Sequence, residues 1–114
     1  MTSEEFVMNF RKEKDYMLNM YFDETSDSYT GELISNLVKK GADTAEIKEL
    51  LKSVLNEAFY TILMGLDGEA SLGDMQMQFS IYDEDNVLID DIESYAYDEF
   101  MSDKIGRASC RERV

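Results

Sequence analysis

The chain alternates between stretches with helical hydrophobic spacing and polar stretches that interrupt them. The first helical stretch follows Thr2, which forms a capping box with Glu5, three residues later. Its apolar residues lie mostly on one stripe: Phe6, Val7, Phe10, Met17, Leu18 and Tyr21. This spacing predicts an amphipathic helix that ends before the turn-forming residues 23–28.

Two further helices are predicted before residue 68. A short one starts at about Thr30 and stops at Gly41. We expect its apolar residues to face inward: Leu33, Ile34, Leu37 and Val38. Asp43 and Glu46 form a second capping box, which opens the widest apolar stripe of the sequence. That stripe predicts the central helix of the core: Ile47, Leu50, Leu51, Val54, Leu55, Ala58, Phe59, Ile62 and Leu63.

After residue 74 the hydrophobic period changes from 3.6 to 2. Apolar residues at 75, 77, 79 and 81 alternate with polar ones and predict a half-buried strand. Residues 83–86 form a turn, and residues 87–89 return as a second strand. Asp90 and Glu93 suggest a third capping box before a last helix. Its expected core residues are Ile92, Tyr95, Ala96 and Phe100.

Together these elements predict one α+β domain over residues 1–104. It consists of three N-terminal helices, a small antiparallel β-hairpin or sheet, and a C-terminal helix. Residues 105–114 differ in composition from the sequence before them, because they contain three arginines in ten residues. Their back-translation looks like a short-read sequencing adapter read in frame, so we interpret them as a non-native tail on a gene of metagenomic origin. The native chain is expected to end at or beyond Lys104.

Composition excludes most catalytic chemistry. The sequence has no His, and its one Cys, Cys110, lies in the tail, so residues 1–104 offer no thiolate nucleophile and no Cys-ligated metal. They also show no secretion leader and no apolar run long enough to span a membrane. We therefore expect a cytoplasmic, non-enzymatic protein without cofactor or metal.

Charge is the most informative feature, because acidic and basic residues are segregated. The whole chain has 25 acidic and 11 basic residues, and no cation occurs between residues 53 and 103. Acids gather after residue 82, with two tyrosines that we expect to be exposed among them. The predicted partner-binding residues are Tyr82, Asp83, Glu84, Asp85, Asp90, Asp91, Glu93, Tyr97, Asp98 and Glu99, and Asp103 extends the acidic run.

Other interpretations of the acids stay open. They favour helix N-termini and keep a small domain in solution, which requires no partner. A calcium loop counted from Asp83 fails, because Val87, Leu88 and Ser94 occupy positions that need a ligand or glycine. Catalysis by a carboxylate pair has no motif here, and most of the eight methionines fit core positions better than a binding surface.

We expect the acidic half to dock on a basic surface of a nuclease, toxin or defence effector and to block it. Size, acidity and lack of catalytic groups are similar to those of immunity proteins for bacterial toxins and of phage anti-defence inhibitors that mimic nucleic-acid charge. No family motif is matched. Direct binding to nucleic acid or to a membrane is not expected. The alternatives are an adaptor domain that forms homo-oligomers, and a small-molecule-binding protein with a pocket near Tyr60 and Tyr95.

Overall fold

A computed structural model describes residues 1–101. The helices are α1 (Ser3–Tyr21), α2 (Tyr29–Lys39), α3 (Thr44–Leu66) and α4 (Ile92–Ala96), which continues into a π-helical turn, η1 (Tyr97–Met101). β1 (Ile81–Tyr82) and β2 (Leu88–Ile89) pair antiparallel. The predicted α+β class is thus confirmed: three helices, a hairpin and a C-terminal helix. The domain end expected at Lys104, Asp103 and the tail of residues 105–114 lie outside the described residues.

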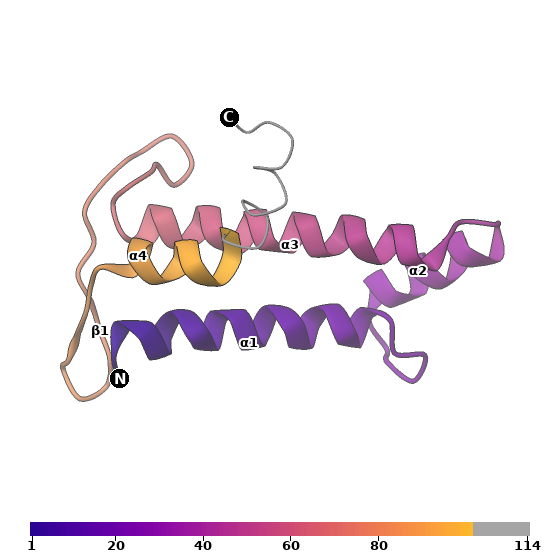
Figure 1. The fold of residues 1–114 in the computed structure, drawn as a ribbon, viewed down its shortest axis with the longest axis horizontal. Coiled ribbons are helices and arrows are strands. Elements are labelled where there is room, and N and C mark those ends of the chain that lie inside the picture. Colours follow the sequence, from indigo (N-terminus) through magenta and orange to yellow (C-terminus); the bar gives the residue numbers. More distant parts are fainter. Residues whose placement is uncertain (102–114) are drawn as a thin grey trace.

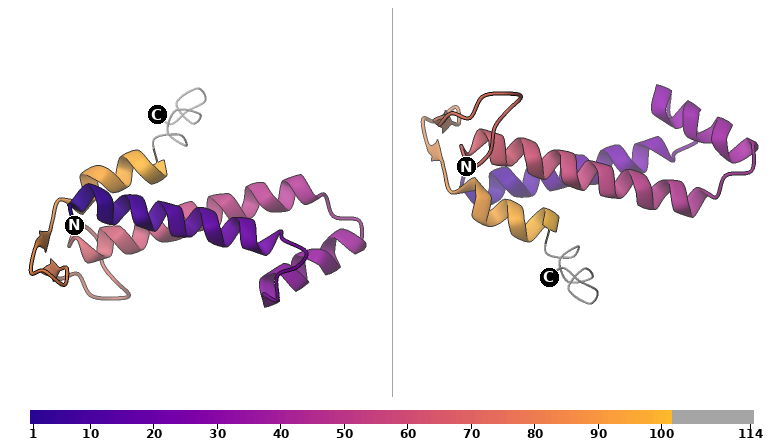
Figure 2. Two further views of the ribbon diagram at one scale, coloured as in Figure 1. Left: turned by 90° about the horizontal axis from the view of Figure 1, so that it is seen from below. Right: turned by 90° about the horizontal axis from the view of Figure 1, so that it is seen from above.

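The molecule is built around two antiparallel helices, α1 and α3, which lie side by side along its long axis (Figure 1). The α4–η1 segment packs against both of them. The hairpin and the N-terminus lie at one end, and α2 lies at the other, as both views in Figure 2 also show. The C-terminal half of the sequence therefore packs against α1, and the hairpin lies next to the N-terminus.

Helix boundaries follow local capping chemistry. Thr2 and Glu5 form the complete capping box at the start of α1, as predicted. Asp43 caps α3 by accepting a hydrogen bond from the Ala45 amide. Gly41 follows α2 with a φ of 106°, a left-handed conformation that favours glycine. These signals explain why the first three helices were predictable within a residue or two.

The core lies between α1, α3 and the C-terminal segment. Its buried members come from sequence positions far apart: Val7, Leu63, Met64, Ile89, Ile92, Ala96 and Phe100. A row of aromatic rings lines one side, with centroid distances of 5.0 Å between Phe6 and Phe10 and 6.2 Å between Phe10 and Phe59. Phe59 then meets Phe100 at 6.0 Å. The predicted core spacing of the last helix is confirmed by burial of Ile92, Ala96 and Phe100.

The strand predicted from Met75 to Ile81 is wrong except at its end. Met75, Met77 and Phe79 are exposed, and the chain before Ile81 runs as a loop. A strand needs a partner for its backbone hydrogen bonds, and β2 offers only two residues before the chain turns into α4. The alternation of apolar residues therefore produces no buried sheet face.

The apolar stripe of α3 also differs from the prediction, because much of it faces solvent. Burial of Leu63 in the core fixes the rotation of the helix. Asn56 and Lys52 lie seven and eleven residues before Leu63, both about 20° from it around the helix, so these polar residues face α1. On α2, Ile34 is buried, but Leu33, Leu37 and Val38, expected to face inward, are exposed.

Candidate functional site

Asp83 organises the tip of the hairpin. Its Oδ1 accepts hydrogen bonds from the backbone amides of Asp85, at 2.8 Å, and Val87, at 2.9 Å. Its Oδ2 lies 2.6 Å from the amino group of Met1. The bond to this ammonium, followed by the bonds to the amides, lowers the pKa of the Asp83 carboxyl. Asp83 is thus half-buried, not exposed as predicted, and it joins the hairpin to the start of α1.

Two more hydrogen bonds hold the following segment at the same end. The Asp90 amide donates to Ser3 Oγ at 3.0 Å. The Glu93 amide donates to Asp67 Oδ2, also at 3.0 Å. The predicted capping box of Asp90 and Glu93 is wrong, because Asp91 occupies the N-cap in a left-handed conformation and forms no side-chain cap bond. Asp67, at the end of α3, supplies the acceptor instead.

These contacts gather acidic residues from four parts of the chain. The electrostatic field at the Met1 ammonium includes contributions from Asp83, Glu5 and Asp85. We call the resulting group the acidic end: Glu5, Asp67, Asp83, Glu84, Asp85, Asp90, Asp91 and Glu93. The Met1 ammonium, whose pKa is raised chiefly by its bond to Asp83, is the positive group that these contacts place among them. Within residues 53–101 no lysine or arginine offsets this charge.

Asp98 and Glu99 lie apart from the acidic end, on η1. Glu99 Oε1 is 3.0 Å from Arg11 Nη1, and the Glu99 side chain is only 22% exposed. Arg11 also approaches Asp15, at 3.7 Å. Asp98 is exposed on the same turn. The predicted surface is therefore divided, since Glu99 is tied to a cation from the N-terminal half.

The two predicted tyrosines are accessible. Tyr82 on β1 is 58% exposed, and Tyr97 at the start of η1 is 41% exposed. Tyr97 and Glu93 both act on Tyr60 of α3, whose pKa is raised first by burial and then by these two neighbours. Tyr82 thus extends the acidic end along the hairpin, whereas Tyr97 borders it next to α3.

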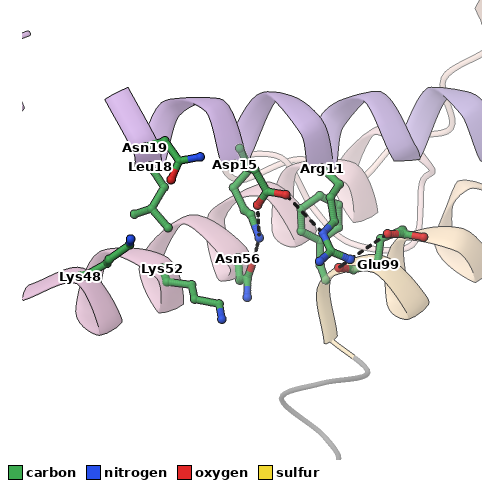
Figure 3. A pocket seen from close by; sticks show the side chains of 10 residues that line it. Arg11, Asp15, Leu18, Asn19, Lys48, Lys52, Asn56 and Glu99 are labelled. Atoms are coloured by element: carbon green, nitrogen blue, oxygen red, sulfur yellow. Dashed lines mark hydrogen bonds and ion pairs between the residues drawn. The ribbon is translucent and has the colours of Figure 1, made fainter. Parts of the chain in front are cut away.

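A polar groove between α1 and α3 was not foreseen from the sequence. Its volume is about 330 Å³. Figure 3 shows residues of both helices and of η1 around it. The charged and amide residues that line it are Arg11, Lys14, Asp15, Asn19, Lys48, Lys52, Asn56 and Glu99. The groove does not include Tyr60 or Tyr95, near which a small-molecule pocket was expected.

Lys14 is the buried charge of this groove, with 3% of the residue exposed. Its Nζ donates to Asn56 Oδ1 at 2.6 Å and lies 3.3 Å from Asp15 Oδ1. It also lies 5.6 Å from the centroid of the Phe100 ring, a cation–π distance. The sequence does hold a signal for this site, because Lys48, Lys52 and Asn56 repeat every four residues on one side of α3.

Comparison of the chain with protein-family models, with curated proteins and with solved structures finds no match. Among residues 1–101, no cluster of three or more acidic, His or Cys side chains is arranged to hold a metal ion. In the same residues, no helix combines the length and hydrophobicity needed to cross a bilayer. Function must therefore be inferred from the surfaces described above.

Proposed function

We propose that the chain is a non-enzymatic, cytoplasmic inhibitor whose acidic end binds a basic surface of another protein. The partner would be a nuclease, toxin or defence effector that uses this surface to hold nucleic acid or another anion. The chain would then act as an immunity protein or as an anti-defence protein that mimics nucleic-acid charge. The observation that carries the proposal is the gathering of carboxylates from α1, α3, the hairpin and α4 at one end of the molecule.

The distribution of charge favours a role in partner binding over a role in solubility alone. Charges that only keep a protein in solution can be spread over its surface. Here a group of eight carboxylates lies at one end, while other exposed acids such as Glu13, Asp27 and Glu49 lie elsewhere. The exposed Tyr82 beside this group offers a large contact area with a hydroxyl group. Concentrated charge of one sign repels nucleic-acid phosphate and speeds encounter with a basic partner.

A charge-matched pair of variants tests the proposal. The first neutralises the acidic end through Glu84→Gln, Asp85→Asn, Asp90→Asn and Glu93→Gln, and it keeps Asp83, which holds the hairpin. The control removes the same charge elsewhere through Glu13→Gln, Asp27→Asn, Glu32→Gln and Glu49→Gln, all at exposed positions. Each protein is added to a panel of purified basic nucleases and toxins, and binding and residual nuclease activity are measured at increasing salt.

We expect wild type and control to inhibit at least one member of the panel, with binding that weakens as salt rises and that duplex DNA displaces. The acidic-end variant should bind the partner with a dissociation constant at least about tenfold higher. The reason is that loss of a few charge contacts weakens binding by this factor or more. Equal inhibition by both variants would contradict the proposal.

The groove supports a second candidate function, the binding of a small anion. Lys48 and Lys52 line it from α3, and together with Arg11 and Lys14 they give it four cations against the carboxylates of Asp15 and Glu99. Inorganic phosphate and citrate are suitable probes, measured by calorimetry with the wild type and with Lys48→Gln/Lys52→Gln. Binding that depends on both lysines and is unaffected by the acidic-end substitutions would favour this candidate over inhibition of a protein.

A further inference from the structure

An apolar stripe on α3 lies on the surface instead of in the core. Leu50 is 62% exposed, Val54 50% and Ile62 47%. Ala58, between them, is exposed as well. These four residues are spaced by four, so they form one row along the helix, centred about 160° away from the buried Leu63. A contiguous exposed apolar row of this kind typically marks an interface.

Within residues 1–101, the row is uncovered because the other elements stop short of it. Toward the end of α3, the side chain of Leu72 lies where a Cβ on Gly65 would be, so the loop after α3 covers the helix at that point. On the other side of the helix, α1 and η1 surround the polar groove. Within the described residues, Leu50, Val54 and Ile62 therefore keep about half or more of their surface in solvent.

We propose that this row is the interface of a homodimer, in which α3 packs antiparallel against α3 of a second copy. The row is symmetric about residue 56. A two-fold axis there places Leu50 opposite Ile62 of the second copy, and Val54 opposite its Ala58. Each side chain then meets an apolar partner, and the small Ala58 allows the helices to approach closely. A self-complementary patch of this kind is what a two-fold interface requires.

Charge selects the second copy in the antiparallel orientation. Near the start of α3, Lys39, Lys40 and Lys48 lie among the acids Asp43, Glu46 and Glu49, so this end carries lysines, which the acidic end lacks. Beyond α3 the chain is acidic without a cation up to residue 101. A parallel dimer would bring two acidic ends together, whereas the antiparallel dimer sets each acidic end beside the lysines of the other copy. Antiparallel packing also aligns the helix dipoles favourably.

The area needed for a stable dimer comes from neighbouring exposed residues. The row from Leu50 to Ile62 is about 18 Å long, less than an interface of about 800 Å² per partner requires. In the antiparallel register, α2 of one copy lies at the level of the loop after α3 in the other. Both carry exposed apolar side chains that would complete the interface: Leu33, Leu37 and Val38 on α2, and Met75, Met77 and Phe79 in the loop.

Sedimentation equilibrium tests the dimer. The wild-type chain should be dimeric at micromolar concentration. The double variant Leu50→Lys/Val54→Lys should raise the dissociation constant of the dimer at least about tenfold, since two apolar side chains that the dimer interface would bury are lost. The matched control is Tyr16→Lys, because Tyr16 is also 62% exposed but lies on α1, about 180° from the buried Val7. Circular dichroism shows that each variant is folded. A monomeric wild type would overturn the proposal.

Cysteine cross-linking tests the orientation, with Cys110 replaced by serine. In the antiparallel dimer, two copies of Leu50→Cys hold their sulfurs about 18 Å apart along the helices, too far for a disulfide. Leu50→Cys mixed with Ile62→Cys should cross-link, and neither should do so alone. Self-linking of each single variant would contradict the antiparallel register.

The two proposals fail independently of each other. Dimer formation through an apolar row should persist at high salt, whereas binding of a basic partner by the acidic end should weaken. The lysine substitutions on α3 leave the acidic end unchanged, and the acidic-end variant leaves the row unchanged. If both proposals hold, one dimer presents two acidic ends that point in opposite directions.

Discussion

Asp67 caps a helix that begins 25 residues after it. Its Oδ2 accepts a hydrogen bond from the Glu93 amide at 3.0 Å, in place of the cap that Asp91 does not form. The end of α3 thereby fixes the start of α4, and with it the direction in which Ile92 and Ala96 enter the core.

Replacement of Asp67 by alanine should therefore destabilise the fold by about 1 kcal/mol, the usual effect of removing an N-cap acceptor. Asp67→Asn keeps an acceptor oxygen and should cost less. Urea denaturation at one fixed protein concentration measures both. Asp74→Ala serves as the control, because Asp74 is an exposed acid in the loop after α3. Equal stability of the Asp67→Ala and Asp74→Ala variants would show that Asp67 does not cap α4.

The bond between Met1 and Asp83 predicts a pH dependence with two limits. The pKa of Asp83 is lowered in the folded state, so its contribution to stability is present above the ordinary value of 3.8 and is lost as the pH falls through the lowered value. The pKa of the Met1 amine is raised, so its contribution is complete below 8.0 and is lost as the pH rises through the raised value.

Acetylation of the Met1 amine should abolish the loss of stability at high pH, because the acetylated group no longer titrates. It should also make the hairpin open more often, because the bond to Asp83 is lost. Hydrogen exchange of the Asp85 and Val87 amides, which Asp83 holds, measures the effect across this pH range. Asp83→Asn is the complementary variant, and it should make exchange insensitive to acetylation. Faster exchange on acetylation in this variant as well would mean that the amine acts through another group.

Lys14 and Asn56 should be coupled energetically. Asn56→Leu leaves the buried ammonium of Lys14 without its amide acceptor, which should cost about 1–3 kcal/mol. Lys14→Met removes the charge itself. In the double variant both changes coincide, so the total loss should be smaller than the sum of the single losses by about 1 kcal/mol. Additive losses in urea denaturation would indicate that Asp15 alone satisfies Lys14.

Gly65→Ala should destabilise α3, although alanine is the better helix former. A Cβ at this buried position would collide with the Leu72 side chain, and overpacking of this kind costs about 1–3 kcal/mol. Leu72→Ala in the same chain should recover much of the loss by making room. Thermal denaturation of the single and double variants tests this, and a Gly65→Ala variant more stable than wild type would refute it.

Much of the fold could be predicted from the sequence where local signals and packing agree. Thr2 with Glu5, Asp43 and Gly41 marked helix boundaries that the structure confirms. The local signals failed where a residue distant in the sequence determines the start of an element. Asp67 replaces the local cap at Glu93, and nothing in the spacing of residues 90–93 reveals this. The alternation after Met75 was real, but no second strand is long enough to use it.

The candidate site was predictable in composition but not in geometry. Absence of cations between residues 53 and 103 identified the acidic half, yet only the folded chain brings Glu5 and Asp67 to the hairpin. It also pairs Glu99 with Arg11 and so separates it from the other acids. Periodicity located the stripe of α3 but not its direction, which depends on how the ten-residue α4–η1 segment covers only one end of that helix.

The shared core of Val7 with Ile89, Ile92 and Phe100 has a consequence for biosynthesis. As the chain leaves the ribosome, α1 and α3 emerge long before the segment that covers Val7 and Leu63. A nascent chain that ends before Ile89 thus exposes both residues, in addition to the stripe on α3. The tertiary structure is complete only once residues 89–101 have emerged, and truncated products should be the species that aggregate or are degraded.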